Sequence, residues 1–163
     1  MQIQSIIALI YDTASSINAK FGTGTEYHLS QAIANHDNFV IEPPYFYLFR
    51  PFNKLTSRVV DSIGWGDTVT LPFVYFHVVN PQDNTTLYEE AQAAGDDFIK
   101  TFVDALDQED LISINEYEGE GDVKYFDGYI VRKFSITATF PDDFDYCSLD
   151  QFGLNQALNS PIG

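Results

Sequence analysis

The chain has 163 residues, of which 45% are hydrophobic and 15% aromatic, so it can form one globular domain with a core of its own. Its 24 Asp and Glu residues against 8 Lys and Arg residues give a formal net charge of -16. Such a surface repels nucleic-acid phosphates and anionic membranes, which argues against a conventional DNA or RNA binder and against a membrane partner. Three classes remain: an ordinary acidic soluble protein, a protein that imitates DNA, and a protein whose acidic face lines a path for DNA.

The N-terminal segment does not have the pattern of a signal peptide, because it lacks a basic region and Gln4, Ser5 and Asp12 interrupt its apolar residues. No run approaches the roughly 18 apolar residues of a membrane helix. Cys147 is the only cysteine, which excludes an internal disulfide. We expect a protein that stays in the cytoplasm where it is made, or that is built into a particle there.

Apolar periodicity predicts two main helices. From residue 2 to about residue 20, apolar side chains recur at helical spacing, and the glycines at 22 and 24 are a common stop signal. These glycines do not form a phosphate-binding loop, because they follow a helix and no Gly-Lys-Ser/Thr sequence ends them. The second helix is predicted over 85–107, where Thr86 and Glu89 fit a capping box. A weaker helical turn is predicted over 30–35.

Alternating or continuous apolar runs predict strands over 39–49, 69–79, 111–117 and 130–140. Pro43 and Pro44 lie in the first of these strands. Because proline cannot donate to a strand ladder, this strand is expected at a sheet edge or with a bend. The polar residues 53–67 are predicted to form an exposed loop or hairpin, and residues 119–122 are predicted to form a turn.

The resulting order is helix, strand, strand, helix, strand, strand. It predicts an α+β fold in which two main helices pack on a mainly antiparallel sheet. We expect a single α+β domain over residues 1–149. A C-terminal arm over residues 150–163 is expected to become ordered only where it meets a partner.

No local motif predicts catalysis, a cofactor or a metal site. His28, His36 and His77 share no ligand spacing, and neither a nucleophile elbow nor a His-Glu-x-x-His helix occurs. Two acidic clusters, at 116–122 and 142–145, have oxygen ligands of the kind that calcium and magnesium take, but neither matches a calcium loop, so a solvated face is the favoured interpretation. In the first cluster, alternation predicts that four side chains share one face of a strand: Glu116, Glu118, Glu120 and Asp122.

Aromatic residues crowd the segment 45–49. They either fill the core of this domain, which is the commoner outcome for large apolar residues, or pack on a neighbouring subunit. If subunits associate, aromatic side chains in exposed segments are the best candidates for their contacts. The candidate contact residues are Tyr45, Phe46, Tyr47, Phe49, Trp65 and Phe152.

Several sequence features together resemble a known protein family. They are Glu42-Pro43-Pro44 in a strand, the apolar strand over 69–79, and a helix with the pattern Ala94-x3-Phe98-Ile99-x2-Phe102-x3-Leu106. A closing strand then runs into Phe144-Asp145-Tyr146-Cys147. Over residues 1–149 the chain resembles the tail-terminator, tail-completion and neck (head–tail joining) proteins of tailed bacteriophages, particularly phages that infect Bacteroidetes.

The resemblance implies a structural virion protein without enzymatic activity or cofactor. Proteins of this family form rings, commonly hexameric, that contact other neck or tail proteins and leave an axial channel through which DNA passes without specific binding. A negative channel wall would repel passing DNA. The candidates to face the channel are Glu116, Glu118, Glu120 and Asp122.

Two other interpretations remain open from the sequence. In the first, the chain is an acidic DNA mimic that inhibits a basic nucleic-acid-binding protein, with the acids of 116–122 and 142–145 as its contact surface. In the second, it is a small enzyme with a metal ion held by carboxylates. The ring protein ranks first, the mimic second and the enzyme third.

Overall fold

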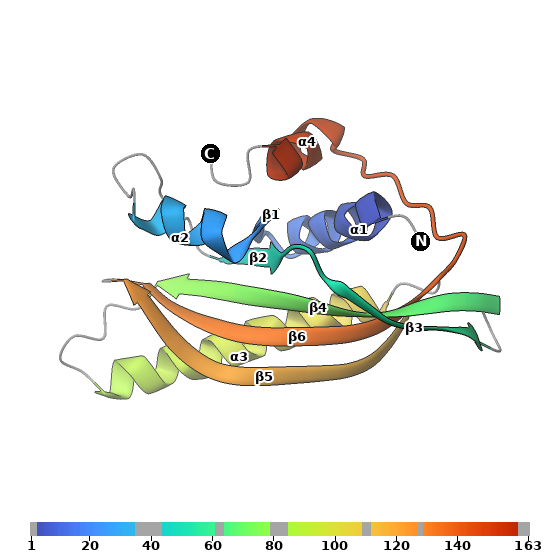
Figure 1. Cartoon of the computed structure of the whole chain (residues 1–163). Coiled ribbons are helices and arrows are strands. Elements are labelled where there is room, and N and C mark those ends of the chain that lie inside the picture. The colour runs from blue at the N-terminus through green and yellow to red at the C-terminus, as the bar shows by residue number, and fades with distance from the viewer. Residues whose placement is uncertain are drawn as a thin grey trace.

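The computed structural model describes residues 3–34, 44–60, 64–78, 85–108, 112–126 and 129–159. Within these ranges the chain forms four helices and one six-stranded sheet, so the predicted α+β class is confirmed (Figure 1). None of the helices in these ranges is long and apolar enough to cross a membrane. In chain order the elements are α1 (Ile3–Ser16), β1 (Lys20–Gly24), α2 (Glu26–Ala34), β2 (Tyr45–Phe49), β3 (Asn53–Val60), β4 (Gly64–Val78), α3 (Thr85–Asp107), β5 (Ser113–Phe126), β6 (Tyr129–Pro141) and α4 (Gln151–Asn159).

The long strands β4 and β6 form the centre of the sheet, where they pair antiparallel from Gly66–Pro141 to Val78–Tyr129. β5 pairs with β6 on one side. On the other side of β4, β2 and β3 lie one after the other, because β2 pairs with residues 73–76 and β3 with residues 64–70. β1 pairs with β2 in parallel and the other pairings are antiparallel, which confirms the predicted mainly antiparallel sheet.

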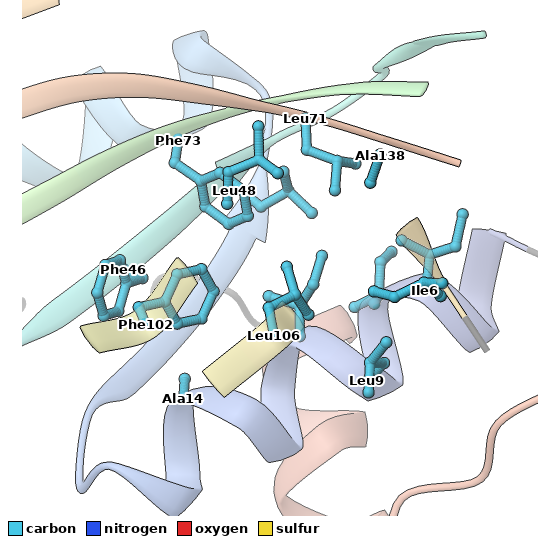
Figure 2. Close-up of a cluster of buried hydrophobic side chains, with 14 of the residues drawn as sticks. Ile6, Leu9, Ala14, Phe46, Leu48, Leu71, Phe73, Phe102, Leu106 and Ala138 are labelled. Atoms are coloured by element: carbon cyan, nitrogen blue, oxygen red, sulfur yellow. The ribbon is translucent and has the colours of Figure 1, made fainter. Parts of the chain in front are cut away.

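Helices α1 and α3 cover one face of the sheet, and side chains from both helices and from the strands form one apolar core between them (Figure 2). The ring of Phe102 in α3 stacks on Phe46 of β2 with centroids 4.5 Å apart, and it meets Phe73 of β4 edge-on. Arg132 of β6 also reaches α3, where its Nε lies 2.7 Å from a carboxylate oxygen of Asp96. The sheet and α3 therefore share both apolar and charged contacts.

The opposite face of the sheet is apolar at one end and polar at the other. α2 lies over the apolar end, where Leu29 packs with buried side chains of β2, β4 and β6. At the polar end, the hydroxyl oxygens of Thr68 and Thr139 are 3.0 Å apart and those of Thr70 and Thr137 are 3.2 Å apart. These cross-strand hydrogen bonds join β4 to β6 and are a favourable pairing in antiparallel sheets.

The structure has more elements than the predicted order of two helices and four strands. The long helix has its predicted bounds, Thr85–Asp107. The first helix ends earlier than predicted, at Ser16, and Asn18 then has a φ of 60°, a left-handed conformation that is common after a helix end. The chain continues directly into β1, a strand that sequence reasoning missed because the glycines at 22 and 24 resembled a stop signal.

The predictions for the strands are partly right. β3 and the first part of β4 form the hairpin that was one of the two alternatives for 53–67. β2 lies between β1 and β4, so the first alternative, an edge position, is wrong for 45–49, while residues 39–43, where the alternative bend was predicted, lie outside the described residues. β5 runs through to Phe126 without the turn predicted over 119–122, because a register shift between Gly119 and Gly121 absorbs the extra residue.

The C-terminal residues differ from the predicted arm. After β6 the chain crosses α1 and forms α4, which packs against β1. Leu154 of α4 is 6% exposed and belongs to the same apolar core as α1 and α3, and Ala157 is also buried. The boundary predicted at residue 149 is therefore not a boundary of the packed domain, which extends at least to α4.

Candidate subunit interface

The aromatic segment 45–49 does not offer a surface to another subunit. Phe46 and Tyr47 are fully buried and Tyr45 is 9% exposed, because β2 is an interior strand with covered side chains on both faces. Phe49, at the end of β2, is half-buried and its ring lies 5.5 Å from that of Tyr47. Burial raises the pKa of Tyr47 to about 12 and also raises that of Tyr45. The alternative, that these side chains fill the core of this domain, is the one that the structure supports.

The other two predicted contact residues lie elsewhere. Phe152, in the first turn of α4, is 74% exposed, and the neighbouring Leu149 is fully exposed. These two large apolar side chains lie at the start of one short helix. Trp65 lies opposite Val59 in the β3–β4 pairing, and its side chain is outside the described part of the structure.

The acidic residues of β5 do not form one alternating series. Glu116 and Glu118 are exposed and lie opposite Thr137 and Ser135, on the polar face of the sheet. Glu120 lies at the register shift between Gly119 and Gly121, and beyond it Asp122 lies opposite Arg132. Because Arg132 is an odd number of residues from Ser135 on β6, the alternation that would place all four acids on one face is interrupted at the bulge.

The described residues contain no group of three or more His, Cys, Asp or Glu side chains that could hold a metal ion. Asp142, Asp143 and Asp145 are all exposed in the segment that follows β6. His28 is exposed in the first turn of α2, where its backbone N–H donates to the Thr25 hydroxyl. His36 and the side chain of His77 lie outside the described part.

Hydrogen bonds that the sequence did not predict fasten the C-terminal segment to α1. Asp12 accepts hydrogen bonds from the hydroxyls of Tyr146, at 2.7 Å, and Ser148, at 2.5 Å. Tyr11 donates to Asp150 at 2.7 Å, and Asp150 also accepts a hydrogen bond from the Gly153 amide in the first turn of α4. Asp150 is therefore the N-cap of α4. Asp is a preferred N-cap residue, and its position directly before residues 151–159 is the one local feature of the sequence that indicates this cap.

These contacts shift the pKa values of both members of the Tyr11–Asp150 pair. Burial, together with the hydrogen bond to Asp150, raises the pKa of Tyr11 to about 12. The same hydrogen bond, with the one from the Gly153 amide, holds the pKa of Asp150 below its usual range. Both shifts favour the state in which Tyr11 keeps its proton and Asp150 is ionised.

A hollow of about 330 Å³ lies between the start of α2 and residues 50–52, which join β2 to β3, and its lining includes Arg50, His28, Gly24 and Phe52. The Nε atom of Arg50 is buried and, among the described residues, has no hydrogen-bond partner. Arg50 is one of only 8 basic residues in the chain. Its guanidinium can pair with a carboxylate, but nothing in the sequence distinguished it beforehand.

Two edges of the sheet remain open within the described residues. β5 pairs only with β6, and the pairing of β3 involves only β4, so β5 and β3 are unpaired along their outer sides. Unpaired N–H and C=O groups along such edges can pair with another chain.

Comparison with models of known protein families gives no match, and none of the curated proteins matches the chain. The candidate interface therefore depends on the geometry of the sheet, its exposed side chains and its charge.

Proposed function

We propose that this chain is a structural protein of a tailed phage, and that several copies form a ring at the neck or the tail end around the DNA channel. The copies would assemble in the host cytoplasm, enter the virion and contact other neck or tail proteins. DNA would pass through the ring without specific binding. This role requires neither a catalytic group nor a cofactor.

The observation that carries the proposal is the pair of open edges on one sheet, β5 on one side and β3 on the other, within the described residues. A contact between two different surfaces of the same chain leaves each copy able to join two neighbours. Such a heterologous contact closes into a ring when its rotation allows. A free edge strand is otherwise an aggregation hazard, which is reason to expect that an assembly covers it.

The polar face of the sheet supports a position next to DNA. Glu116 and Glu118 are exposed there, beside the half-buried Ser135 and Thr137 of β6. α1 and α3 cover the opposite face. In a ring with the polar face inside, these carboxylates and the net charge of -16 would repel DNA phosphates.

Light scattering of the full chain at several protein concentrations, together with electron microscopy of the same samples, tests the proposal. We expect one oligomer of fixed size, whose population rises with protein concentration and which appears as a ring with a central hole. We also expect that DNA does not retain the protein. A chain that stays monomeric or dimeric at every concentration contradicts the ring. If that chain also binds a basic nucleic-acid-binding protein in a salt-sensitive way, the result favours the DNA-mimic interpretation.

A further inference from the structure

We propose that the hollow beside Arg50 binds a small organic carboxylate, that is, a molecule in which one carboxylate is attached to a compact apolar group. The Arg50 guanidinium binds the carboxylate, and the apolar part of the lining contacts the remainder of the molecule. This inference is independent of the proposed ring, because a single copy of the chain contains all of these lining residues.

The backbone around the hollow is held by the sheet and by the start of a helix. Gly24 is the last residue of β1 and pairs with Phe49 of β2, and the Arg50 amide donates a hydrogen bond to the Gly24 carbonyl at 2.7 Å. Directly after Gly24, Thr25 caps α2, because its hydroxyl accepts a hydrogen bond from the His28 amide at 3.1 Å. These bonds join two sides of the hollow, and a site that is held in place before binding lowers the cost of ordering on binding.

Arg50 brings a positive charge to this hollow. Its Nε atom is buried and has no hydrogen-bond partner in the described ranges. A buried donor without an acceptor is unfavourable, and more so when the group is charged. A ligand carboxylate has two acceptor oxygens, which a guanidinium binds through two parallel N–H groups. A carboxylate is therefore the group that best satisfies Arg50.

The surroundings of Arg50 also favour an anion. The first turn of α2, a helix of nine residues, adjoins the hollow through Thr25 and His28, and a helix N-terminus favours negative charge. The His28 imidazole is a further source of an N–H donor. The described lining residues include no acid, and Asp145 lines a neighbouring groove together with Arg50.

The remaining lining is apolar and distinguishes an organic carboxylate from an inorganic anion. It consists of Ile3, Pro51 and Phe52. Ile3 is a large apolar residue that is 49% exposed, so an apolar group in the hollow would remove part of its surface from water. Phosphate would gain nothing from these contacts. The volume of about 330 Å³ lies at the lower end of the range for ligand pockets, which suits a compact molecule.

Titration of the full chain, followed by nuclear magnetic resonance, tests the site with 3-phenylpropionate as the probe. We expect the amide signals of Gly24, His28 and Phe52 to change, with a dissociation constant of about 1 mM or below. Two matched probes separate charge from shape. The amide 3-phenylpropanamide has the ring without the charge, and inorganic phosphate has charge without the ring, so each should bind about tenfold more weakly or worse.

The variant Arg50→Met removes the charge and keeps a long side chain. Its affinity for 3-phenylpropionate should fall about tenfold or more, whereas its affinity for the amide should change little. The control is Lys100→Met, which makes the same change in net charge at an exposed position of α3 and should bind as the wild type does. Circular dichroism verifies that the variants are folded. If Arg50→Met does not fold, Arg50→Lys replaces it, and the loss of the planar fork should lower the affinity about threefold or more.

Three results would overturn the proposal. They are the absence of signal changes with 3-phenylpropionate at up to about 10 mM, equal affinities for the acid and its amide, and an unchanged affinity in a folded Arg50 variant. A dipeptide that ends in phenylalanine provides a last comparison, because binding about tenfold tighter than that of 3-phenylpropionate would assign the hollow to a peptide C-terminus instead. The ring is tested separately by the size of the oligomer, so the failure of one proposal leaves the other standing.

Discussion

Tyr146 donates its hydroxyl hydrogen to Asp12 Oδ2 across 2.7 Å, although 134 positions separate the two residues along the chain. The same carboxylate accepts the Ser148 hydroxyl through its other oxygen. One side chain of α1 therefore holds two points of the segment that leads from β6 to α4. Because Ser148 is buried, its hydroxyl has little access to replacement partners in water if Asp12 is lost.

Replacing Asp12 by Ala should lower the free energy of unfolding by roughly 1–3 kcal/mol, because it removes the acceptor of the buried Ser148 hydroxyl. Urea unfolding measures this change, and limited proteolysis should show earlier cleavage between β6 and α4. The exposed Asp104→Ala on α3 is the control and should change the free energy by less than about 0.5 kcal/mol. Equal effects of the two substitutions would mean that the C-terminal segment is not held at Asp12.

Stability should fall in alkaline solution, in part through Tyr11. The folded chain holds the Tyr11 proton up to a pKa of about 12, whereas the ordinary tyrosine pKa is 10.0. Between these values the unfolded chain binds fewer protons than the folded chain, so the free energy of unfolding decreases as the pH rises. Below the ordinary pKa this contribution does not change with pH.

The Tyr11→Phe variant should therefore show a shallower loss of stability than the wild type between about pH 10 and pH 12. Urea unfolding at a series of pH values measures the slope. Tyr27, which is 68% exposed, provides the control substitution Tyr27→Phe. If the slope of the free energy of unfolding against pH is the same in Tyr11→Phe as in the wild type but smaller in Tyr27→Phe, the alkaline loss of stability does not come from Tyr11.

Two of the six predicted contact residues, Phe46 and Phe152, should respond very differently to substitution. Phe46→Ala removes a fully buried ring that stacks on Phe102, so it should cost about 3–5 kcal/mol of the free energy of unfolding. Phe152→Ser replaces a side chain that is 74% exposed and should change it by less than about 0.5 kcal/mol. Chemical unfolding of both variants at low protein concentration, where assembly does not contribute, makes the comparison.

Gly66 is a position where even one added methyl group should be costly. A Cβ there would lie 2.8 Å from the Phe140 carbonyl oxygen and 3.2 Å from the Thr139 methyl group, where β4 pairs with β6. Gly66→Ala should lower the free energy of unfolding by roughly 1–3 kcal/mol, since backbone cannot move aside cheaply. At Gly119 the nearest atom is 3.4 Å away, so Gly119→Ala in β5 is the matched control, with an expected change below about 0.5 kcal/mol. Thermal unfolding of the pair tests whether the close approach limits the position.

Local sequence patterns were sufficient to predict the elements whose apolar periodicity lies within their own segment. The sequence of α3 has a long apolar stripe, and the bounds of the helix were predicted correctly. β6 alternates between apolar and polar residues along its length, and its observed bounds, Tyr129–Pro141, differ from the prediction by one residue at each end.

Elements that depend on distant partners could not be predicted in this way. β1 is a five-residue strand with two glycines, and its pairing partner β2 begins 25 residues further along the chain. The interior position of β2 follows from that pairing, and the burial of Phe46 and Tyr47 follows in turn. α4 is fastened through Asp12 and Tyr11, more than 130 positions away, so the sequence around 150–159 resembled a free arm.

The open edges of the sheet were not predicted, and three of the six aromatic residues predicted to make subunit contacts are buried. Aromatic content pointed to residues 45–49, although large apolar side chains are mostly buried and these are no exception. The exposure of Phe152 and of the first two acids of β5 agrees with the expectation that they lie at the surface. The two open edges became visible only with the pairing of the strands, because an edge is a property of the whole sheet.

The packing of α4 against β1 bears on how copies would join in the proposed ring. β1 is the third edge strand of the sheet, and α4 lies against it, whereas β3 and β5 are open in the described residues. If copies join through β3 and β5 as proposed, each copy has two unlike contact surfaces, and such copies make closed cycles or unbranched chains rather than a branched network. Which of the two forms appears then depends on the rotation between successive copies, and electron microscopy distinguishes a closed ring from an open chain.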